Sequence, residues 1–280
     1  MKVENGYWPG KRQTLNWKSP RNIEPDGVAR VRVWGHVADM KLAWLWVYIF
    51  SLIAASGFEL PRDSSQCVVG VAAGWNSSTV NLRYFEKRGG GWKQVGNAWK
   101  GRLGSKGLVW GRGLHPNPSG ATLKKESDGR SPAGVFDLGG VWGAHKGVKK
   151  HPKLSYRQVT SRDLWVEDPG SGSYNRHLVL DHEPSTAWEK KAQMKQNDYP
   201  QSLKMFIAHN APPKVVANGG SSIFFHIWRR EGAAATAGCT TMIEDRLRWL
   251  IATVDPSRRP TYVLLPQAEY DRLKPLWKLP

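Results

Sequence analysis

The chain has 280 residues, enough for one large or two ordinary domains, and its 40% hydrophobic content with 15 tryptophans excludes a disordered chain. Its formal net charge of +18 indicates a polyanionic partner, either nucleic acid, anionic lipid or an acidic cell-wall polymer. A basic surface without a specific partner is the alternative. Because no nucleic-acid-binding module is recognisable, we expect no nucleic-acid partner.

The N-terminal region divides into two parts. Residues 1–39 are polar and have no hydrophobic periodicity, whereas residues 42–58 carry no charge, follow Lys41 and contain Ala54-Ala55-Ser56 near their end. This pattern predicts a signal peptide over residues 40–56, or an uncleaved membrane anchor, in a protein exported to the periplasm or cell envelope. Since Met40-Lys41 resembles a natural signal-peptide start, we interpret residues 1–39 as an over-extended reading frame. A short cytoplasmic tail is the alternative.

The exported part keeps most of the positive charge. Residues 42–280 carry 33 basic and 19 acidic side chains, a net charge of +14, which would attract an anionic cell envelope. An exported protein with two cysteines allows a disulfide between Cys67 and Cys239. However, Cys67 lies in an alternating, β-branched run, where a free cysteine behaves as a small buried hydrophobe, so this pattern favours free thiols.

Short apolar runs separated by turn residues follow from residue 66 onward. We expect strands over 66–73 and 79–88, then a glycine-rich middle. Helices are expected only at 185–197, which begins with a serine, and at 243–254, which is amphipathic. The sequence therefore predicts one mainly β domain over residues 57–280. Its sheet would be sandwich-like or partly closed with one or two short helices, and we expect a monomer.

A cysteine and a histidine stand out near the C-terminal end of this domain. Cys239 follows Gly238 and a run of small residues and comes before a predicted helix, a position that lowers a thiol pKa. Gly238 allows close backbone approach, and the amides around Cys239, supported by Thr236 and Thr240, would stabilise an oxyanion. His226 ends an apolar run and would act as the base.

Two ordered motifs indicate a family. The run from His226 to Met242, with Thr236-Ala237-Gly238-Cys239 at its centre, resembles the catalytic signature of bacterial L,D-transpeptidases. The upstream segment RSPAGVFDLG, residues 130–139, resembles the segment that supports the cleft in that family, and Tyr174-Asn175 resembles a branch with a longer insertion. The likeness covers about residues 64–270. The positions that match the upstream motif are Ser131, Pro132, Gly134 and Phe136.

The resemblance implies a mainly β fold and peptidoglycan stem peptides as substrates. It implies that Cys239 attacks the third stem residue, that His226 moves the protons, and that the acyl group passes to an amine or to water. It implies no cofactor and no metal. Two positions depart from the family pattern: Ala237 replaces its usual histidine, and Thr241 replaces its usual Arg or Asn. These departures keep a non-catalytic cell-wall-binding module as an alternative.

Other polar residues offer further alternatives. Arg229 and Arg230, in the loop between the two motifs, are candidates to bind a substrate carboxylate, although a solvated loop is the favoured interpretation. A zinc-dependent wall amidase is a third alternative, because His177, Asp181, His182 and His209 are zinc-ligand types. No compact zinc motif accompanies them, so loop and core histidines are the favoured interpretation.

Overall fold

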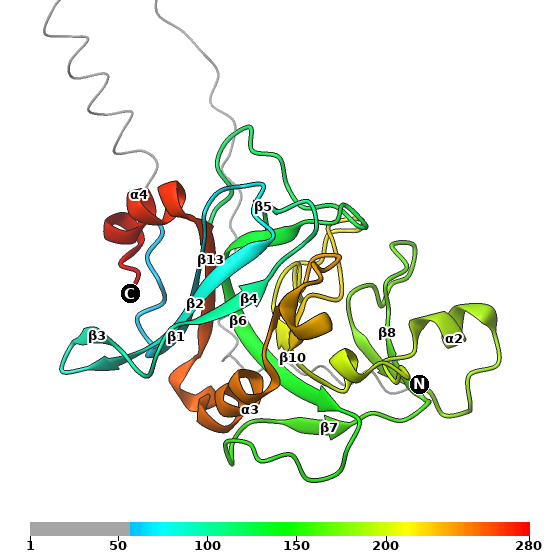
Figure 1. The fold of residues 1–280 in the computed structure, drawn as a ribbon. Coiled ribbons are helices and arrows are strands. Elements are labelled where there is room, and N and C mark those ends of the chain that lie inside the picture. Colours follow the sequence, from blue (N-terminus) through cyan, green and yellow to red (C-terminus); the bar gives the residue numbers. More distant parts are fainter. Residues whose placement is uncertain (1–56) are drawn as a thin grey trace, which may run out of the picture. The chain divides into compact units, whose positions relative to one another are not determined.

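The structure of the protein is a computed structural model that describes residues 57–280, and β-strands predominate in it (Figure 1). The strands are β1 Gln66–Ala72, β2 Thr79–Arg88, β3 Gly91–Gln94, β4 Trp99–Arg102, β5 Leu108–Trp110, β6 Ser131–Gly143, β7 Tyr156–Gln158, β8 Asp163–Trp165, β9 His177–Val179, β10 Leu203–Ile207, β11 Phe224–Ile227, β12 Thr240–Met242 and β13 Thr261–Pro266. The helices are α2 Ala187–Ala192, α3 Glu244–Thr253 and α4 Gln267–Trp277, with short 3-10 turns at Tyr199–Gln201, Arg230–Gly232 and Pro256–Arg258. The predicted mainly β class is confirmed.

The main sheet closes on itself. Its strands follow the order β1, β13, β6, β10, β11, β12, β4, β2, and β2 then pairs with β1. Strand β3 extends from β2, while β5 and β7 pair with the long strand β6. Most neighbours are antiparallel, but β1 runs parallel to β13 and β11 parallel to β12. The predicted sandwich faces are therefore two sides of one continuous, closed sheet, in which β11 and β12 lie side by side.

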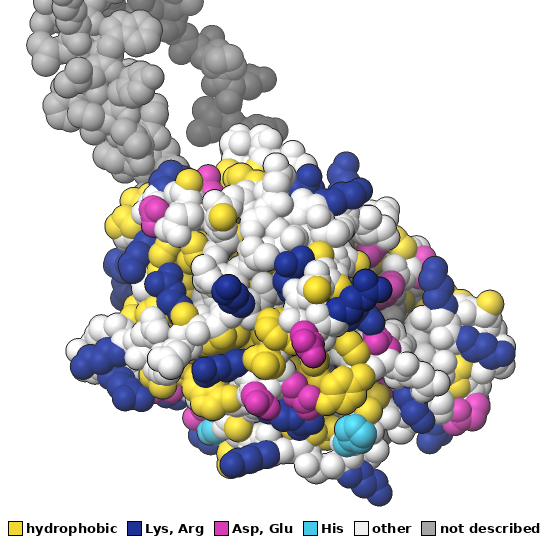
Figure 2. All heavy atoms as spheres, viewed as in Figure 1, with side chains coloured by type: hydrophobic (Ala, Val, Ile, Leu, Met, Phe, Trp, Pro, Cys, Tyr) yellow, Lys and Arg dark blue, Asp and Glu magenta, His cyan; other side chains and the backbone are white. Residues whose placement is uncertain are grey.

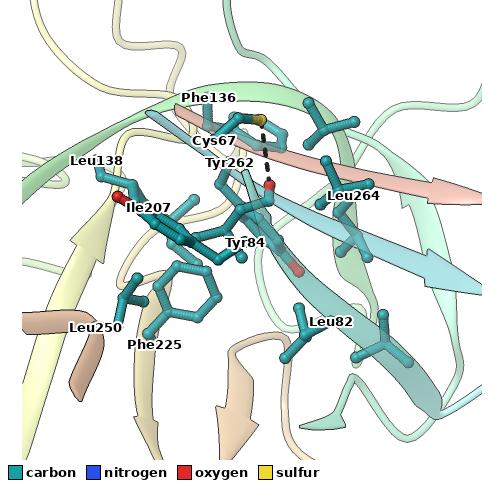
Figure 3. Packing of buried hydrophobic residues seen from close by; sticks show 14 of the residues in the cluster. Cys67, Leu82, Tyr84, Phe136, Leu138, Ile207, Phe225, Leu250, Tyr262 and Leu264 are labelled. Atoms are coloured by element: carbon teal, nitrogen blue, oxygen red, sulfur yellow. Dashed lines mark hydrogen bonds between the residues drawn. The ribbon is translucent and has the colours of Figure 1, made fainter. Parts of the chain in front are cut away.

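The closed sheet surrounds the largest apolar core (Figure 3). Tyr84, Phe136, Phe225 and Tyr262 fill it, and each is almost completely buried. Cys67 belongs to this core as a free thiol, and burial raises its pKa to about 12. Cys239 is also a free thiol. The alternative of a disulfide between the two cysteines is therefore not realised.

A small lobe inserted between β7 and β10 carries the hairpin β8–β9 and helix α2 (Figure 1). Its own apolar cluster consists of Leu164, Val166, Leu178 and Leu180. Helix α2 is shorter than predicted and begins with a capping box between Thr186 and Glu189. A second cluster lies where the lobe meets the main sheet and contains Trp142, Trp165, Phe206 and Phe224, against which Cys239 packs.

Helix α3 matches the predicted amphipathic segment and buries Leu247, Leu250 and Ile251. The sequence analysis missed α4, which has Pro275 inside it and buries Tyr270, Leu273 and Trp277. None of the helices found within residues 57–280 has the length and hydropathy needed to span a bilayer. The predictions for residues 1–39 and 40–56 lie outside the described residues.

Candidate active site

The loop that carries Cys239 is held by the side chain of Thr236. The Thr236 hydroxyl donates to the carbonyl of Cys239 at 2.7 Å and accepts the amide of Gly238 at 3.0 Å. The backbone of Thr236 also bonds to neighbours of β4, because its amide donates to Leu103 O and its carbonyl accepts from Ser105, both at 2.8 Å. These bonds fix the turn just before β12 begins.

The upstream motif supports the same turn from the interior. Ser131, at the start of β6 and fully buried, donates its hydroxyl to the carbonyl of Gly238 at 2.8 Å. The same oxygen accepts the amide of Gly104 at 2.9 Å. A Cβ at Gly238 would lie 3.0 Å from the carbonyl oxygen of Arg130, so the absence of a side chain allows the two backbones to approach closely. The two motifs are thus in direct contact.

Glycine is required inside the upstream motif as well. Gly134 has φ +136°, and a Cβ there would lie 1.8 Å from Cε1 of His115. The His115 ring occupies that space because its Nδ1 accepts the amide of Val135 at 3.0 Å. Phe136 points into the main core, where it is completely buried. The conformation of the motif therefore contributes to packing, and the hydroxyl of Ser131 provides its hydrogen bond to the cysteine loop.

Cys239 is a partly exposed residue, and its thiol donates to the carbonyl of Ser222 at 3.3 Å. Burial raises the pKa of the thiol. A hydrogen bond with the backbone of Phe224 and the positive charges of Lys204 and Lys124 lower it again, but only in part. The expectation of a helix N-terminus that lowers this pKa was wrong. Strand β12 separates Cys239 from α3, so the helix dipole does not act at the sulfur.

His226 lies in the middle of the neighbouring strand β11 and is buried. Its Nδ1 donates to the carbonyl oxygen of Ile227 at 2.8 Å, so Nδ1 carries the proton and Nε2 is the hydrogen-bond acceptor of the ring. Burial lowers the pKa of His226 to about 4, which keeps the ring neutral at pH 7. Nε2 lies 3.4 Å from Nε2 of Gln201. The histidine is therefore in the form that accepts a proton.

Cys239 and His226 line one cavity of about 220 Å³, together with Gln201, Arg229, Thr241 and the small residues 234–237. Within residues 57–280 no hydrogen bond joins the thiol to the imidazole, because the thiol donates to Ser222 instead. The Thr241 hydroxyl is buried without a hydrogen-bond partner among the same residues. The structure thus brings the two predicted residues to one cavity with both groups neutral.

The remaining predicted residues occupy different environments. Arg229 is exposed at the edge of this cavity, and its guanidinium forms an ion pair with Asp198. Arg230 is exposed and does not line the cavity. The Thr240 hydroxyl points into the main core, where it bonds to the hydroxyl of Tyr262 at 3.1 Å. Thr240 therefore stabilises the start of β12 from the core side.

A second cavity, of about 290 Å³, opens on the other side of Cys239 between the main sheet and the lobe. Two buried lysines, Lys124 and Lys204, line it with Trp165 and Phe224. The sequence analysis missed both lysines. For Lys204 a signal was present, since it is a single charge within the otherwise apolar strand LKMFI of β10.

Asn175 connects the lobe to the site. Its buried amide group accepts from Trp165 Nε1 and from the backbone amide of Ser222, both at 3.0 Å. Its nitrogen donates to the carbonyls of His209 and Asn210. The Ser222 carbonyl accepts the thiol of Cys239. Asn175 of the lobe and Cys239 therefore bond to the two backbone polar groups of the same residue, Ser222.

The histidines of the zinc alternative do not converge. His177 bonds to Asp163 at 2.8 Å, His182 to Asp181 and Glu189, and buried His209 to backbone groups of Arg112 and Gly219. Residues 57–280 contain no group of three or more His, Cys, Asp or Glu side chains arranged to hold a metal. These histidines therefore have hydrogen-bond partners within the protein.

Comparison with known proteins identifies the family. Residues 82–263 match the family described as YkuD, L,D-transpeptidase catalytic domain, and the chain belongs to this family. The match includes the upstream motif, His226 and Cys239.

Similar solved structures include Bd1075 from Bdellovibrio bacteriovorus, at 12% identity and TM-score 0.32 over 78% of this chain and 56% of that one. A single-substitution variant of the helical cell shape determining protein Pgp2 from Campylobacter jejuni is similar at 13% identity and TM-score 0.33. That alignment covers 79% of this chain and 54% of Pgp2. This chain thus spans little more than half of either protein. No curated protein sequence gives a significant match.

Proposed function

We propose that the protein is an exported acyltransferase of the L,D-transpeptidase type that acts on peptidoglycan stem peptides in the periplasm or cell envelope. Cys239 is the nucleophile and His226 is the general base. The observation that carries this proposal is the shared cavity, which is lined by the partly exposed residue Cys239 and by His226 with its neutral imidazole. A raised thiol pKa beside a lowered imidazole pKa disfavours a resting ion pair, so proton transfer accompanies attack on the substrate.

The reaction has two acyl-transfer steps. His226 Nε2 takes the thiol proton as Cys239 attacks the carbonyl carbon of the third stem residue, and a C–S bond forms. The C–N bond to the fourth residue then breaks, and His226 returns the proton to the leaving amine, which departs as D-alanine. An acceptor amine next attacks the thioester, forming a new amide and restoring the thiol. Water as the acceptor gives an L,D-carboxypeptidase.

The developing oxyanion needs donors from the cysteine loop. The amide of Gly238 is already bonded to the Thr236 hydroxyl, which leaves the amide of Cys239 as the donor nearest the reacting carbonyl. Thr236 acts by shaping the turn, and Thr240 by anchoring it from the core. Arg229 belongs to the rim of the site, where its charge is already paired with Asp198.

The positive charge favours the proposed location. Figure 2 shows basic side chains spread over the visible face among acidic and apolar ones, without a single dominant patch. A dispersed positive charge of this kind concentrates the protein near an anionic polymer without fixing the position or orientation in which it binds. The rival function is a non-catalytic wall-binding module, which is favoured by Ala237, by Thr241 and by the missing thiol–imidazole hydrogen bond.

The test is acylation by a carbapenem, followed by intact mass of the full chain. Wild type should gain one adduct, Cys239→Ala none, and Cys67→Ala one, because Cys67 lies in the core with a pKa of about 12. His226→Ala should acylate at least tenfold more slowly. An unmodified wild type, with tetrapeptide stems also left intact, would refute the enzyme proposal and support the wall-binding module.

A further inference from the structure

Lys204 is an unusual residue beside the candidate nucleophile. It lies in β10 directly opposite His226 of β11, and cross-strand partners of this kind project from the same face of a sheet. Lys204 is 4% exposed and lines the cavity of about 290 Å³ together with Cys239. The lysine is therefore buried on the reactive side of the sheet and not in the main core.

The positive charge of Lys204 is only weakly offset by the groups around it. Its ammonium donates to the carbonyl of Met194 at 3.4 Å and lies 5.7 Å from the centre of the Phe224 ring. No carboxylate within residues 57–280 forms an ion pair with it, and Glu167 and Asp198 act on it only at longer range. Burial lowers its pKa to about 8, so the group is still mostly protonated at neutral pH.

The neighbouring lysine provides the contrast. Lys124 is equally buried and lines the same cavity, but its ammonium bonds to Asp128 at 2.7 Å. Its charge is therefore neutralised within the protein. A buried charge without a counterion is costly, so such a group persists where a ligand supplies the opposite charge. Of the two buried lysines in this cavity, only Lys204 lacks a counterion within residues 57–280.

We propose that Lys204 binds the free carboxylate of the leaving residue in the donor stem and thereby selects stems that end immediately after the attacked bond. This inference rests on the proposed function of Cys239. That carboxylate is separated from the attacked carbonyl by a single residue, which matches a cavity shared by the thiol and the ammonium. A longer or amidated stem leaves the ammonium unpaired in the apolar setting of Trp165 and Phe224.

The cavity favours a single carboxylate over a more highly charged anion. Besides the lysines, its wall includes the acidic side chains of Glu126 and Glu167, which repel a phosphate dianion more strongly than a singly charged carboxylate. Glu126 is held by the hydroxyl groups of Tyr174 and Ser221, so it is a fixed part of the wall. One unpaired ammonium matches one negative charge on the ligand.

The test separates binding from reaction. In the full-length Cys239→Ala protein, the dissociation constants of a synthetic stem tetrapeptide ending in D-alanine and of its C-terminal amide are measured by calorimetry. The free acid should bind at least tenfold more tightly than the amide. Adding Lys204→Met should reduce this ratio to below threefold by weakening only the free acid. Lys190→Met, an equal charge change on the exposed face of α2, should leave the ratio unchanged.

The outcomes distinguish the two proposals. An equal affinity for both peptides, or a ratio that survives Lys204→Met, refutes the role of Lys204 even if the wild-type protein cleaves the tetrapeptide. A ratio that depends on Lys204 in a protein whose wild type leaves the tetrapeptide intact supports the carboxylate site and refutes the enzyme proposal. Turnover of both peptides by wild type should show the same preference in kcat/KM, which Lys204→Met should abolish.

Discussion

Ser131 offers the most direct test of how the two motifs cooperate. Replacing it with alanine removes the only side-chain oxygen that bonds both the Gly238 carbonyl and the Gly104 amide. Both groups lie in the interior, and each unsatisfied buried polar group costs about 1–3 kcal/mol. Ser131→Ala should therefore lower the free energy of unfolding by about 2–4 kcal/mol.

Urea unfolding followed by tryptophan fluorescence measures this loss, and the melting temperature should fall by roughly 5–12 °C. Ser77→Ala is the matched control, because its hydroxyl also bonds two backbone groups, both of Thr79, but does so in contact with solvent. The control should change stability by less than about 0.5 kcal/mol. If Ser131→Ala were no more destabilising than Ser77→Ala, the proposed coupling of the two motifs would be wrong.

Three further predictions concern buried charge and packing. Lys204→Met should raise the free energy of unfolding at pH 7 by up to about 3 kcal/mol, because burial lowers the lysine pKa from 10.5 to about 8, and this gain should vanish above pH 10.5. Gly134→Ala should unfold the domain or destabilise it by more than about 4 kcal/mol, measured by thermal unfolding, because its Cβ would overlap His115. The histidines His115, His209 and His226 have folded-state pKa values of about 4, 3 and 4, below their ordinary 6.5. Their stabilising contribution is therefore complete above pH 6.5 and is lost as the pH falls towards 4. The free energy of unfolding should drop by roughly 2 kcal/mol or more between pH 7 and pH 5; equal urea midpoints at the two pH values would contradict this.

The sequence predicted local structure well where periodicity was strong. The predicted limits of β2 are those of the structure, and α3 differs by one residue at each end. Helix α4 was missed because Pro275 normally argues against a helix interior, but the buried Trp277 and Tyr270 hold its last turn. The closure of the sheet depends on pairing between β1 and β2 and between β1 and β13, and such long-range pairing leaves no local pattern.

The site was predictable to a similar degree. Cys239 and His226 could be selected because a recognisable motif surrounds each, and the structure places both at one cavity. Their ionisation could not be predicted, because it depends on burial by Trp165, Phe224 and the lobe, which are distant in sequence. Lys204 was overlooked because a lysine in a strand is ordinarily a surface residue, and only the fold shows which face of β10 it occupies.

The hydrogen bonds at Ser222 link the inserted lobe to the thiol of Cys239. Asn175 accepts the amide of Ser222, and the carbonyl of the same residue accepts the thiol of Cys239, which forms no hydrogen bond to His226 within residues 57–280. Under the proposed function, a stem peptide that enters between lobe and sheet would compete for this peptide unit and release the thiol for rotation towards His226. Reactivity would then be coupled to occupancy, and an empty enzyme would be protected from oxidation and from unproductive acylation.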